Sequence, residues 1–144
     1  NLLNQLTEKT YKEFNAIYSN SFILNYVINN NLNRIIENKI DIKTVIEYNL
    51  FDIFDFDTQL SLFEYLLDIS INSCLKSDIK NRIIIIKSGV YANNIFLKLT
   101  IPDQSINKNE IENELIQFLD NISYSLSIKT LNCSHVDIAI FIKK

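Results

Sequence analysis

Glycine is the residue whose scarcity constrains this sequence most. The 144 residues include a single glycine, Gly89, where an average chain of this length would carry roughly ten. Loops that cradle phosphate groups need glycine, because their backbone N–H groups approach the phosphates at dihedral angles that other residues avoid. One glycine therefore excludes a P-loop, a dinucleotide-binding fingerprint and a glycine-rich lid.

Cysteine, proline and methionine are also scarce. The sequence has two cysteines, one proline and no methionine. Cys74 and Cys133 lie far apart and match neither a disulfide framework nor a metal-ligand spacing, so we expect both to be reduced and structural. Because the chain starts at Asn1 without a methionine, we expect it to be a fragment, a processed form or a trimmed form, with relevant residues upstream.

Charge of one sign is not concentrated in the sequence. There are 14 basic and 17 acidic residues, for a formal net charge of −3, and Arg34 and Arg82 are the two arginines. Phosphate contacts need clustered Lys and Arg, so the composition argues against a nucleic-acid partner. The sequence has neither an apolar run near the ~20 residues that cross a bilayer nor a signal-peptide pattern, which predicts no membrane partner and a cytoplasmic location.

What the chain does have is enough apolar material for a core. Hydrophobic residues make up 47% and charged residues 22%, as in soluble globular domains. Apolar residues at spacings of three and four predict a helix over residues 3–36, with a break or kink near 29–31. Its apolar stripe needs either a second subunit or the chain's own domain as a partner, and both alternatives stay open. The candidates for a dimer interface are Phe14, Ile17, Tyr18, Leu24 and Ile28.

The middle of the chain is predicted to be helical too. Asp41 suits the N-cap of a second, short helix. Three aspartates follow at 52, 55 and 57, but a calcium loop would also need a glycine turn and a later acidic ligand, so we expect no metal there. Asp57 is instead predicted to cap a third helix over about 58–76.

The rest of the chain predicts two hairpins around one more helix. RIIIIK at 82–87 is a buried strand, 88–94 a connection, and 95–101 a second strand that Pro102 ends. A capping-box-like start at Asn107 opens a helix over 107–122. Alternating residues near 126–130 and 136–142 form the last hairpin, turning at 132–135. The predicted class is α+β: an N-terminal helical segment (1–40), then an α/β two-layer sandwich (41–144) with about four strands in two hairpins.

The helix and hairpin over residues 66–100 resemble the ATP-binding domain of sensor histidine kinases, in the GHKL superfamily. There, a helix carrying an Asn-centred motif is followed directly by a β-hairpin. LDISINSCLK at 67–76 is similar to the family's L-D-N-A-x-E-A stretch, and 124–144 is similar to its two closing strands. The resemblance covers roughly residues 40–144 and implies that fold, with the helical start standing for part of a dimerisation helix pair.

The departures from the family pattern fall on its nucleotide site. In the best register of the resemblance, the degenerate motif positions are Asp68, Ile69 and Asn72: the metal-coordinating Asn becomes Ile69, and the acidic residue becomes Asn72. A register shifted by three residues restores an Asn at Asn72, but the acidic residue that should follow it is then missing too. The D-x-G-x-G segment reads IPDQS at 101–105, with no glycine. No ATP site carries over, and we expect no cofactor, no metal and no catalytic residue in this chain.

A degenerate GHKL-like domain beside a helix pair also resembles the Spo0B/ChpT-type histidine phosphotransferases. The single histidine, His135, falls in a predicted hairpin turn, so a phosphoacceptor would have to lie upstream of Asn1. The resemblance implies a non-catalytic two-component signalling protein, phosphotransferase-like or a pseudokinase, that dimerises and docks a response regulator. The alternative is a structural or assembly α+β protein unrelated to GHKL. An enzyme ranks third, because Glu112 and Glu114 lie on a solvated helix face and no Ser-His-Asp set can be argued.

Overall fold

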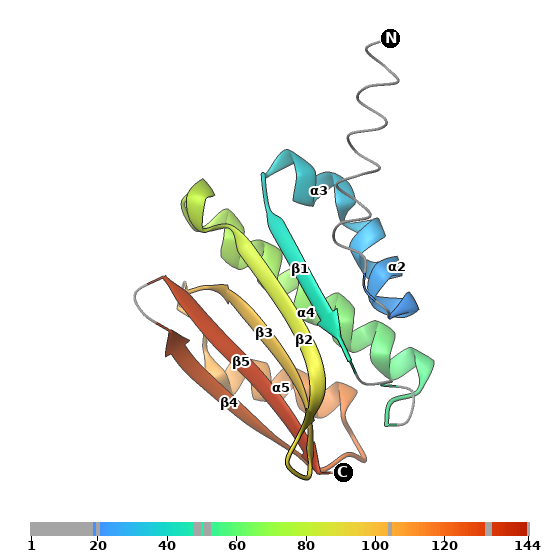
Figure 1. Ribbon diagram of the computed structural model, residues 1–144. Helices are drawn as coiled ribbons and strands as arrows, with labels where there is room; N and C mark the ends of the chain where they lie inside the picture. The colour runs from blue at the N-terminus through green and yellow to red at the C-terminus, as the bar shows by residue number, and fades with distance from the viewer. Residues whose placement is uncertain are drawn as a thin grey trace.

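A five-stranded mixed sheet forms one layer of the protein, and its helices form the other (Figure 1). The computed structural model describes residues 19, 21–47, 50, 53–103, 105–131 and 134–143. The strand order is β1-β2-β3-β5-β4, and Figure 1 shows α4 and α5 behind the sheet. The elements are α2 (Phe22–Asn30), α3 (Leu32–Glu37), β1 (Asp41–Ile46), α4 (Phe56–Leu75), η2 (Ile79–Asn81), β2 (Ile83–Tyr91), β3 (Asn94–Pro102), α5 (Lys108–Phe118), β4 (Tyr124–Leu131) and β5 (His135–Lys143).

The strand β1 corrects the prediction of a short helix beginning at Asp41. Residues 41–46 pair in parallel with β2, from Asp41 opposite Ile83 to Ile46 opposite Ser88. Ile42 and Ile46 are buried, four residues apart on the same side of the strand. A short apolar run fits a helix or a strand equally well, and here the β-branched side chains and the edge of β2 favour the strand. The α+β class is confirmed, with five strands in place of about four.

The break predicted near residues 29–31 is confirmed. α2 ends at Asn30 and α3 begins at Leu32. The Asn31 side-chain amide donates to the Val27 carbonyl oxygen at 2.9 Å, which satisfies a carbonyl that the end of α2 leaves without a helical partner. At the other end of α2, the Ser21 hydroxyl accepts a hydrogen bond from the Leu24 N–H at 3.1 Å.

The helix α4 lies across the sheet and begins two residues earlier than predicted. Asp55, not Asp57, is its N-cap: the Asp55 carboxylate accepts from the Thr58 N–H at 2.8 Å. Hydrogen bonding to the Thr58 side chain, and then to its N–H, lowers the pKa of the Asp55 carboxyl. Asp57 lies in the first turn, where a negative charge interacts favourably with the helix dipole. The buried side of α4 includes Leu62, Phe63, Leu66, Leu67, Ile71 and Cys74.

The two predicted hairpins are both present, with longer strands than expected. β2 and β3 continue into the predicted connection as far as Tyr91 and Asn94, which pair across the turn. β5 lies between β3 and β4 and pairs antiparallel with both. Alternate residues of β3 and β5 face the helices and are buried, as Leu97, Leu99, Ile138 and Ile140 show. The other side of the sheet is its open face.

The described part of the N-terminal segment belongs to the same core as the sheet. Ile23, Leu24, Val27, Ile28 and Ile35 are in one buried cluster with residues of α4 and of the sheet. Among the described residues, a domain boundary at residue 40 would therefore separate side chains that pack against one another. The helix α2 is an integral part of the helical layer.

Candidate functional site

A groove of about 520 Å3 opens on the helical side of the molecule, between α2, α4 and the end of α5. One side of α4 supplies half of its lining, with residues three and four apart. It is lined by Val27, Asn30, Asn31, Ser61, Glu64, Tyr65, Asp68 and Phe118. Asp68, one of the degenerate motif positions, is thus on the groove wall. The groove is therefore the candidate site for the chemistry of the family that the sequence resembles.

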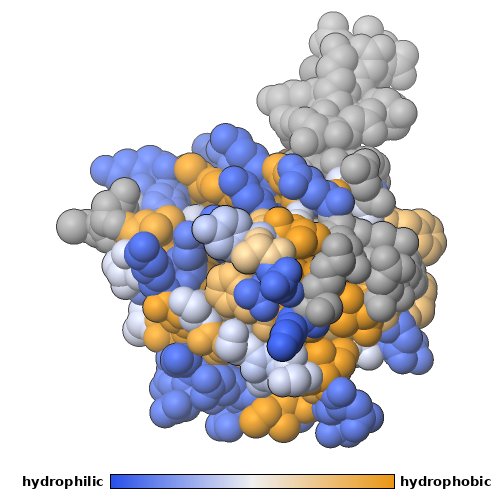
Figure 2. Space-filling model, turned by 60° about the horizontal axis from the view of Figure 1, so that its bottom comes forward, coloured by the Kyte–Doolittle hydropathy of each residue, from blue (hydrophilic) through white to orange (hydrophobic). Residues whose placement is uncertain are grey.

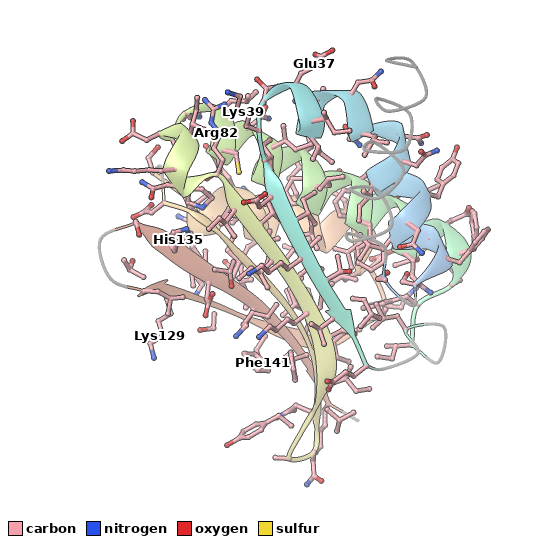
Figure 3. The ribbon with its side chains drawn as sticks, turned by 45° about the horizontal axis from the view of Figure 1, so that its top comes forward. Glu37, Lys39, Arg82, Lys129, His135 and Phe141 are labelled. Carbon is pink, nitrogen blue, oxygen red and sulfur yellow. The ribbon has the colours of Figure 1, made fainter. Side chains whose placement is uncertain are left out.

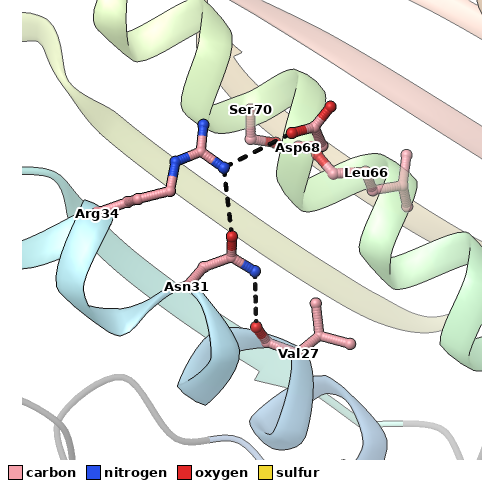
Figure 4. Close-up of polar contacts among 6 residues, drawn as sticks. All are labelled: Val27, Asn31, Arg34, Leu66, Asp68 and Ser70. Atoms are coloured by element: carbon pink, nitrogen blue, oxygen red, sulfur yellow. Dashed lines mark hydrogen bonds and ion pairs between the residues drawn. The ribbon is translucent and has the colours of Figure 1, made fainter.

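Asp68 ties α4 to α3 across the groove. Its carboxylate lies 3.7 Å from the Arg34 guanidinium, and the same Arg34 nitrogen donates to the Asn31 side-chain oxygen at 3.4 Å. Asn31 in turn donates to the Val27 carbonyl, so one chain of polar contacts joins the three helical segments (Figure 4). The Arg34 and Asp68 side chains are 44% and 61% exposed, and an ion pair this exposed contributes at most about 1 kcal/mol.

The other two motif positions do not join Asp68 around a common point. Ile69 is half-buried and packs against the hydrophobic core, while Asn72 is exposed on the next turn of α4. An alkyl side chain offers no atom to a metal ion. Among the described residues, no three His, Cys, Asp or Glu side chains are grouped so that they could hold one.

Tyr65 brings the helices α4 and α5 together at the floor of the groove. Its ring and that of Phe118 are 5.6 Å apart between centroids and tilted by 47°. Burial raises the pKa of the Tyr65 hydroxyl, and the nearby Glu114 and Glu110 carboxylates raise it further. The groove is therefore bordered by carboxylates of α4 and α5, a setting that repels an anion.

The end of β3, where the family carries its D-x-G-x-G segment, is closed by contacts within the chain. The Ser73 hydroxyl donates to the Pro102 carbonyl, which binds α4 to the last residue of β3. The Asp103 N–H donates to the Ser134 carbonyl at 3.2 Å and so is not available to a phosphate. The resemblance aligns the alkyl side chain of Ile69 with a metal-coordinating Asn, and carboxylates border the groove, so these side chains fit a nucleotide poorly.

His135 is the first residue of β5, at one end of the sheet (Figure 3). Its Nδ1 lies 2.8 Å from the Ser134 hydroxyl, and its Nε2 is buried with no hydrogen-bond partner among the described residues. A phosphoacceptor imidazole must present a ring nitrogen to a phosphoryl donor, and this ring presents neither freely. The prediction that His135 lies in the hairpin turn is corrected: it begins β5, and its side chain is half-buried.

The remaining predicted residues divide between the core and the part of the chain outside the described residues. Leu24 and Ile28 are fully buried within this chain, which favours packing within the domain, while a dimer interface through this segment stays a prediction. Phe14, Ile17, Tyr18 and Cys133 lie outside the described residues. Cys74 is free and buried, as predicted, and burial raises the pKa of its thiol to about 12.

Prediction from the sequence found Asp68 but missed the other groove residues. From the sequence, Asn31 is expected only in the helix break, and Glu64 and Tyr65 have no expected role. The signal that could have found them is the spacing of Ser61, Glu64, Tyr65 and Asp68 on one side of α4. The spacing does not reveal that α2 and the end of α5 approach that side of α4.

Among the described residues, no helix has both the length and the apolar character needed to cross a membrane.

Comparison with known proteins gives a match at the level of fold. No family model and no curated protein matches the sequence. The catalytic domain of the histidine kinase ThkA is 12% identical with a TM-score of 0.63, over 85% of this chain and 90% of that one. The Acinetobacter baumannii histidine kinase AdeS is 13% identical with a TM-score of 0.65, over 99% and 81%. The histidine kinase domain of the E. coli osmosensor EnvZ is 12% identical with a TM-score of 0.51, over 84% and 83%. The chain thus has the GHKL-type fold of histidine kinase catalytic domains.

Proposed function

We propose that this chain is a non-catalytic domain of two-component signalling, phosphotransferase-like or a pseudokinase, that does not bind ATP and acts by docking another protein. The fold similarity to histidine kinase catalytic domains supports the link to signalling. The observation that carries the non-catalytic part is Ile69, an alkyl side chain packed on the core, at the position that the best register of the resemblance aligns with the family's metal-coordinating Asn.

The surroundings of Ile69 argue the same way. The groove lined by its neighbour Asp68 is also bordered by Glu64 on α4 and by Glu110 and Glu114 near Tyr65. A triphosphate carries several negative charges, and without a bound cation it would meet these carboxylates directly. Replacing Ile69 alone would therefore not restore a nucleotide site.

The single histidine favours docking over phosphate relay by this chain itself. His135 has one ring nitrogen beside a hydroxyl and the other buried. A phosphotransferase of this type would need its acceptor histidine elsewhere than at His135. A response regulator is the partner expected for a domain of this fold, since the phosphoryl group moves from kinase to regulator in such systems.

Calorimetry with Mg-ATP tests the non-catalytic half of the proposal. We expect no binding heat for the wild type and none for Ile69→Asn, because the carboxylates and the glycine-free loop remain. An active histidine kinase catalytic domain titrated under the same conditions is the control. Saturable binding of Mg-ATP to the wild type at micromolar concentration would overturn the assignment.

Interferometry with a panel of response-regulator receiver domains tests the docking half. We expect at least one receiver domain to bind with a dissociation constant in the micromolar range, as is common for transient signalling contacts. Unrelated domains of matched net charge serve as controls. If no receiver domain binds above these controls, the alternative of a structural or assembly protein takes its place.

A further inference from the structure

The open face of the sheet is the side that no described helix covers. Strand pairing places six residues of β2, β3 and β5 next to one another there, and we call them the sheet patch. Phe96 lies opposite Phe141, Lys87 opposite Lys98, and Asn94 lies between Tyr91 and Lys143. The sheet patch consists of Lys87, Tyr91, Phe96, Lys98, Phe141 and Lys143.

The one glycine of the chain makes room for the aromatic centre of the sheet patch. Gly89 lies opposite Phe96 on the neighbouring strand, and its φ is not positive, so its backbone conformation does not require glycine. A Cβ at Gly89 would come within 3.1 Å of the Phe96 ring. Glycine therefore lets this ring lie over the β2 backbone, flat on the sheet, in the manner of an aromatic ring covering a strand glycine.

The aromatic side chains are accessible. Tyr91 is 74% exposed, and Phe96 and Phe141 are half-buried. Figure 3 shows Phe141 and Lys129 on the side of the sheet away from the helices. Figure 2 brings the end that carries the β2–β3 turn forward and shows apolar groups separated by hydrophilic ones. An apolar centre bordered by charged groups is how a protein interface is built: a desolvated middle and a polar rim.

Basic residues outnumber acidic ones on the open face of the sheet, whereas carboxylates border the groove on the helical layer. The open face carries five lysines (43, 87, 98, 129 and 143) and three carboxylates (Asp41, Glu47 and Asp137). One of the three carboxylates, Asp137, is paired with Lys98 at 3.7 Å. The helical layer carries the groove carboxylates, and the whole chain has a net charge of −3. The open face is thus a basic surface on an acidic protein.

We infer that the sheet patch is the docking surface of this domain and that its protein partner presents an acidic surface with an apolar centre. The inference rests on the proposed docking function and adds to it a place and a partner chemistry. The rings of Tyr91, Phe96 and Phe141 bury apolar area, which holds the complex together. The lysines at the rim attract the acidic partner and raise the association rate.

Two substitutions test this, with the receiver domains that bind the wild type as the probe. Tyr91→Ala removes an exposed ring at the hairpin end, and Lys87→Glu reverses a rim charge. We expect each to weaken binding roughly tenfold. Tyr91→Ala should raise the dissociation rate, and Lys87→Glu should lower the association rate at low salt. Ile116→Ala and Lys108→Glu, an exposed apolar residue and an exposed lysine on α5, are the matched controls and should change affinity less than twofold.

The outcomes separate the two proposals. If receiver domains bind and all four variants bind equally well, the docking function stands and the sheet patch is overturned. If no receiver domain binds, the docking function falls. The sheet patch is then decided by a labelled peptide of alternating Glu and Leu, which must bind the wild type and lose affinity with Tyr91→Ala and Lys87→Glu.

Two other occupants of the same face are also distinguished. A wild-type dimer in sedimentation that Lys87→Glu dissociates and Lys108→Glu leaves intact would assign the sheet patch to a second copy of this chain. Binding of a labelled oligothymidine that both patch variants abolish would assign it to a single-stranded nucleic acid. Either result would overturn the acidic protein partner. Circular dichroism of each variant confirms that a loss of binding does not come from a loss of fold.

Discussion

At the scale of single residues, the burial of Cys74 makes the stability of the fold depend on pH. The side chain is completely buried on α4. Burial raises the pKa of its thiol to about 12, and the nearby Arg82 opposes the rise. A raised folded-state pKa contributes stability that is fully present below the ordinary value of the thiol, 9.0, and is lost as the pH rises through the folded-state value.

We therefore expect the free energy of unfolding to fall between about pH 9 and pH 12, at no more than about 1.4 kcal/mol per pH unit from this group. Urea unfolding at a series of pH values measures it in a Cys133→Ser background. Cys74→Ala in the same background is the control, since it keeps the titrating tyrosines and loses this contribution. Equal slopes for the two proteins would contradict the assignment, as would rapid reaction of native Cys74 with a thiol reagent at pH 8.

Gly89 is a position where space, not backbone conformation, requires glycine. Gly89→Val should lower the free energy of unfolding by about 1–3 kcal/mol, because the added carbons meet the Phe96 ring and the Glu47 carboxylate at 3.1–3.4 Å. Urea denaturation of the single and double variants checks this. In a Phe96→Ala background the same substitution should cost less, by at least about 0.5 kcal/mol. An unchanged cost in both backgrounds would show that the ring is not the obstacle.

At the scale of elements, Arg82 joins three segments that are distant in the sequence. It lies just before β2, and its guanidinium donates to the Asn38 carbonyl at 2.9 Å and to the Ser77 carbonyl at 3.2 Å. These bonds fix the turn after α3 and the turn after α4 to the start of β2. In the same place the Asp41 N–H donates to the Arg82 carbonyl at 2.9 Å, so the entry to β1 depends on this residue.

Arg82→Ala should lower the free energy of unfolding by about 1–3 kcal/mol, because two carbonyl groups in partly buried hydrogen bonds lose a charged donor. Arg82→Lys should recover less than half of that, since an ammonium group cannot reach both carbonyls in the geometry of a guanidinium. Urea denaturation measures the loss, and faster hydrogen exchange of the Asp41 amide locates it. Lys80→Ala, at an exposed neighbour, is the control. A loss no larger than that of Lys80→Ala would contradict the role of Arg82.

The elements also show how far the sequence alone can lead. Both hairpins, α4 and α5 were predictable, because their apolar periods are long enough to distinguish strand from helix. The strand β1 was not, since its six residues fit a helical stripe that continues to Leu50 and Ile53. Its parallel pairing with β2 depends on residues about forty positions away. The local signal for a strand was the enrichment in β-branched residues at Ile42, Thr44 and Ile46.

The candidate site was less accessible from the sequence than the fold. The motif comparison identified Ile69 and Asn72 as departures, and the structure explains why Ile69 is tolerated: it packs on the core. The groove itself depends on how α2 and α5 approach α4. That approach is set by tertiary packing, for which the sequence has no local signature. The sheet patch depends in the same way on the register of β2, β3 and β5.

At the scale of the whole molecule, α2 and the sheet share one hydrophobic core. Leu24, Val27 and Ile28 are fully buried, and α2 packs along α4. Burying an aliphatic side chain of this size contributes about 1.5–3 kcal/mol. The net stability of a domain is only roughly 5–15 kcal/mol, so losing the burial of three such side chains would remove a large part of it.

We expect the chain cut back to residues 41–144 to lose cooperative unfolding, because that deletion exposes the side of α4 that α2 covers. Thermal unfolding followed at 222 nm and by tyrosine absorbance measures it, and in the intact chain the two transitions should coincide. Leu24→Ala in the intact chain separates α2 from the rest of the deleted segment, with an expected loss of about 2–5 kcal/mol. A cooperative transition in the shortened chain, at the midpoint of the intact one, would show that the sandwich is an independent domain and that α2 only rests against it.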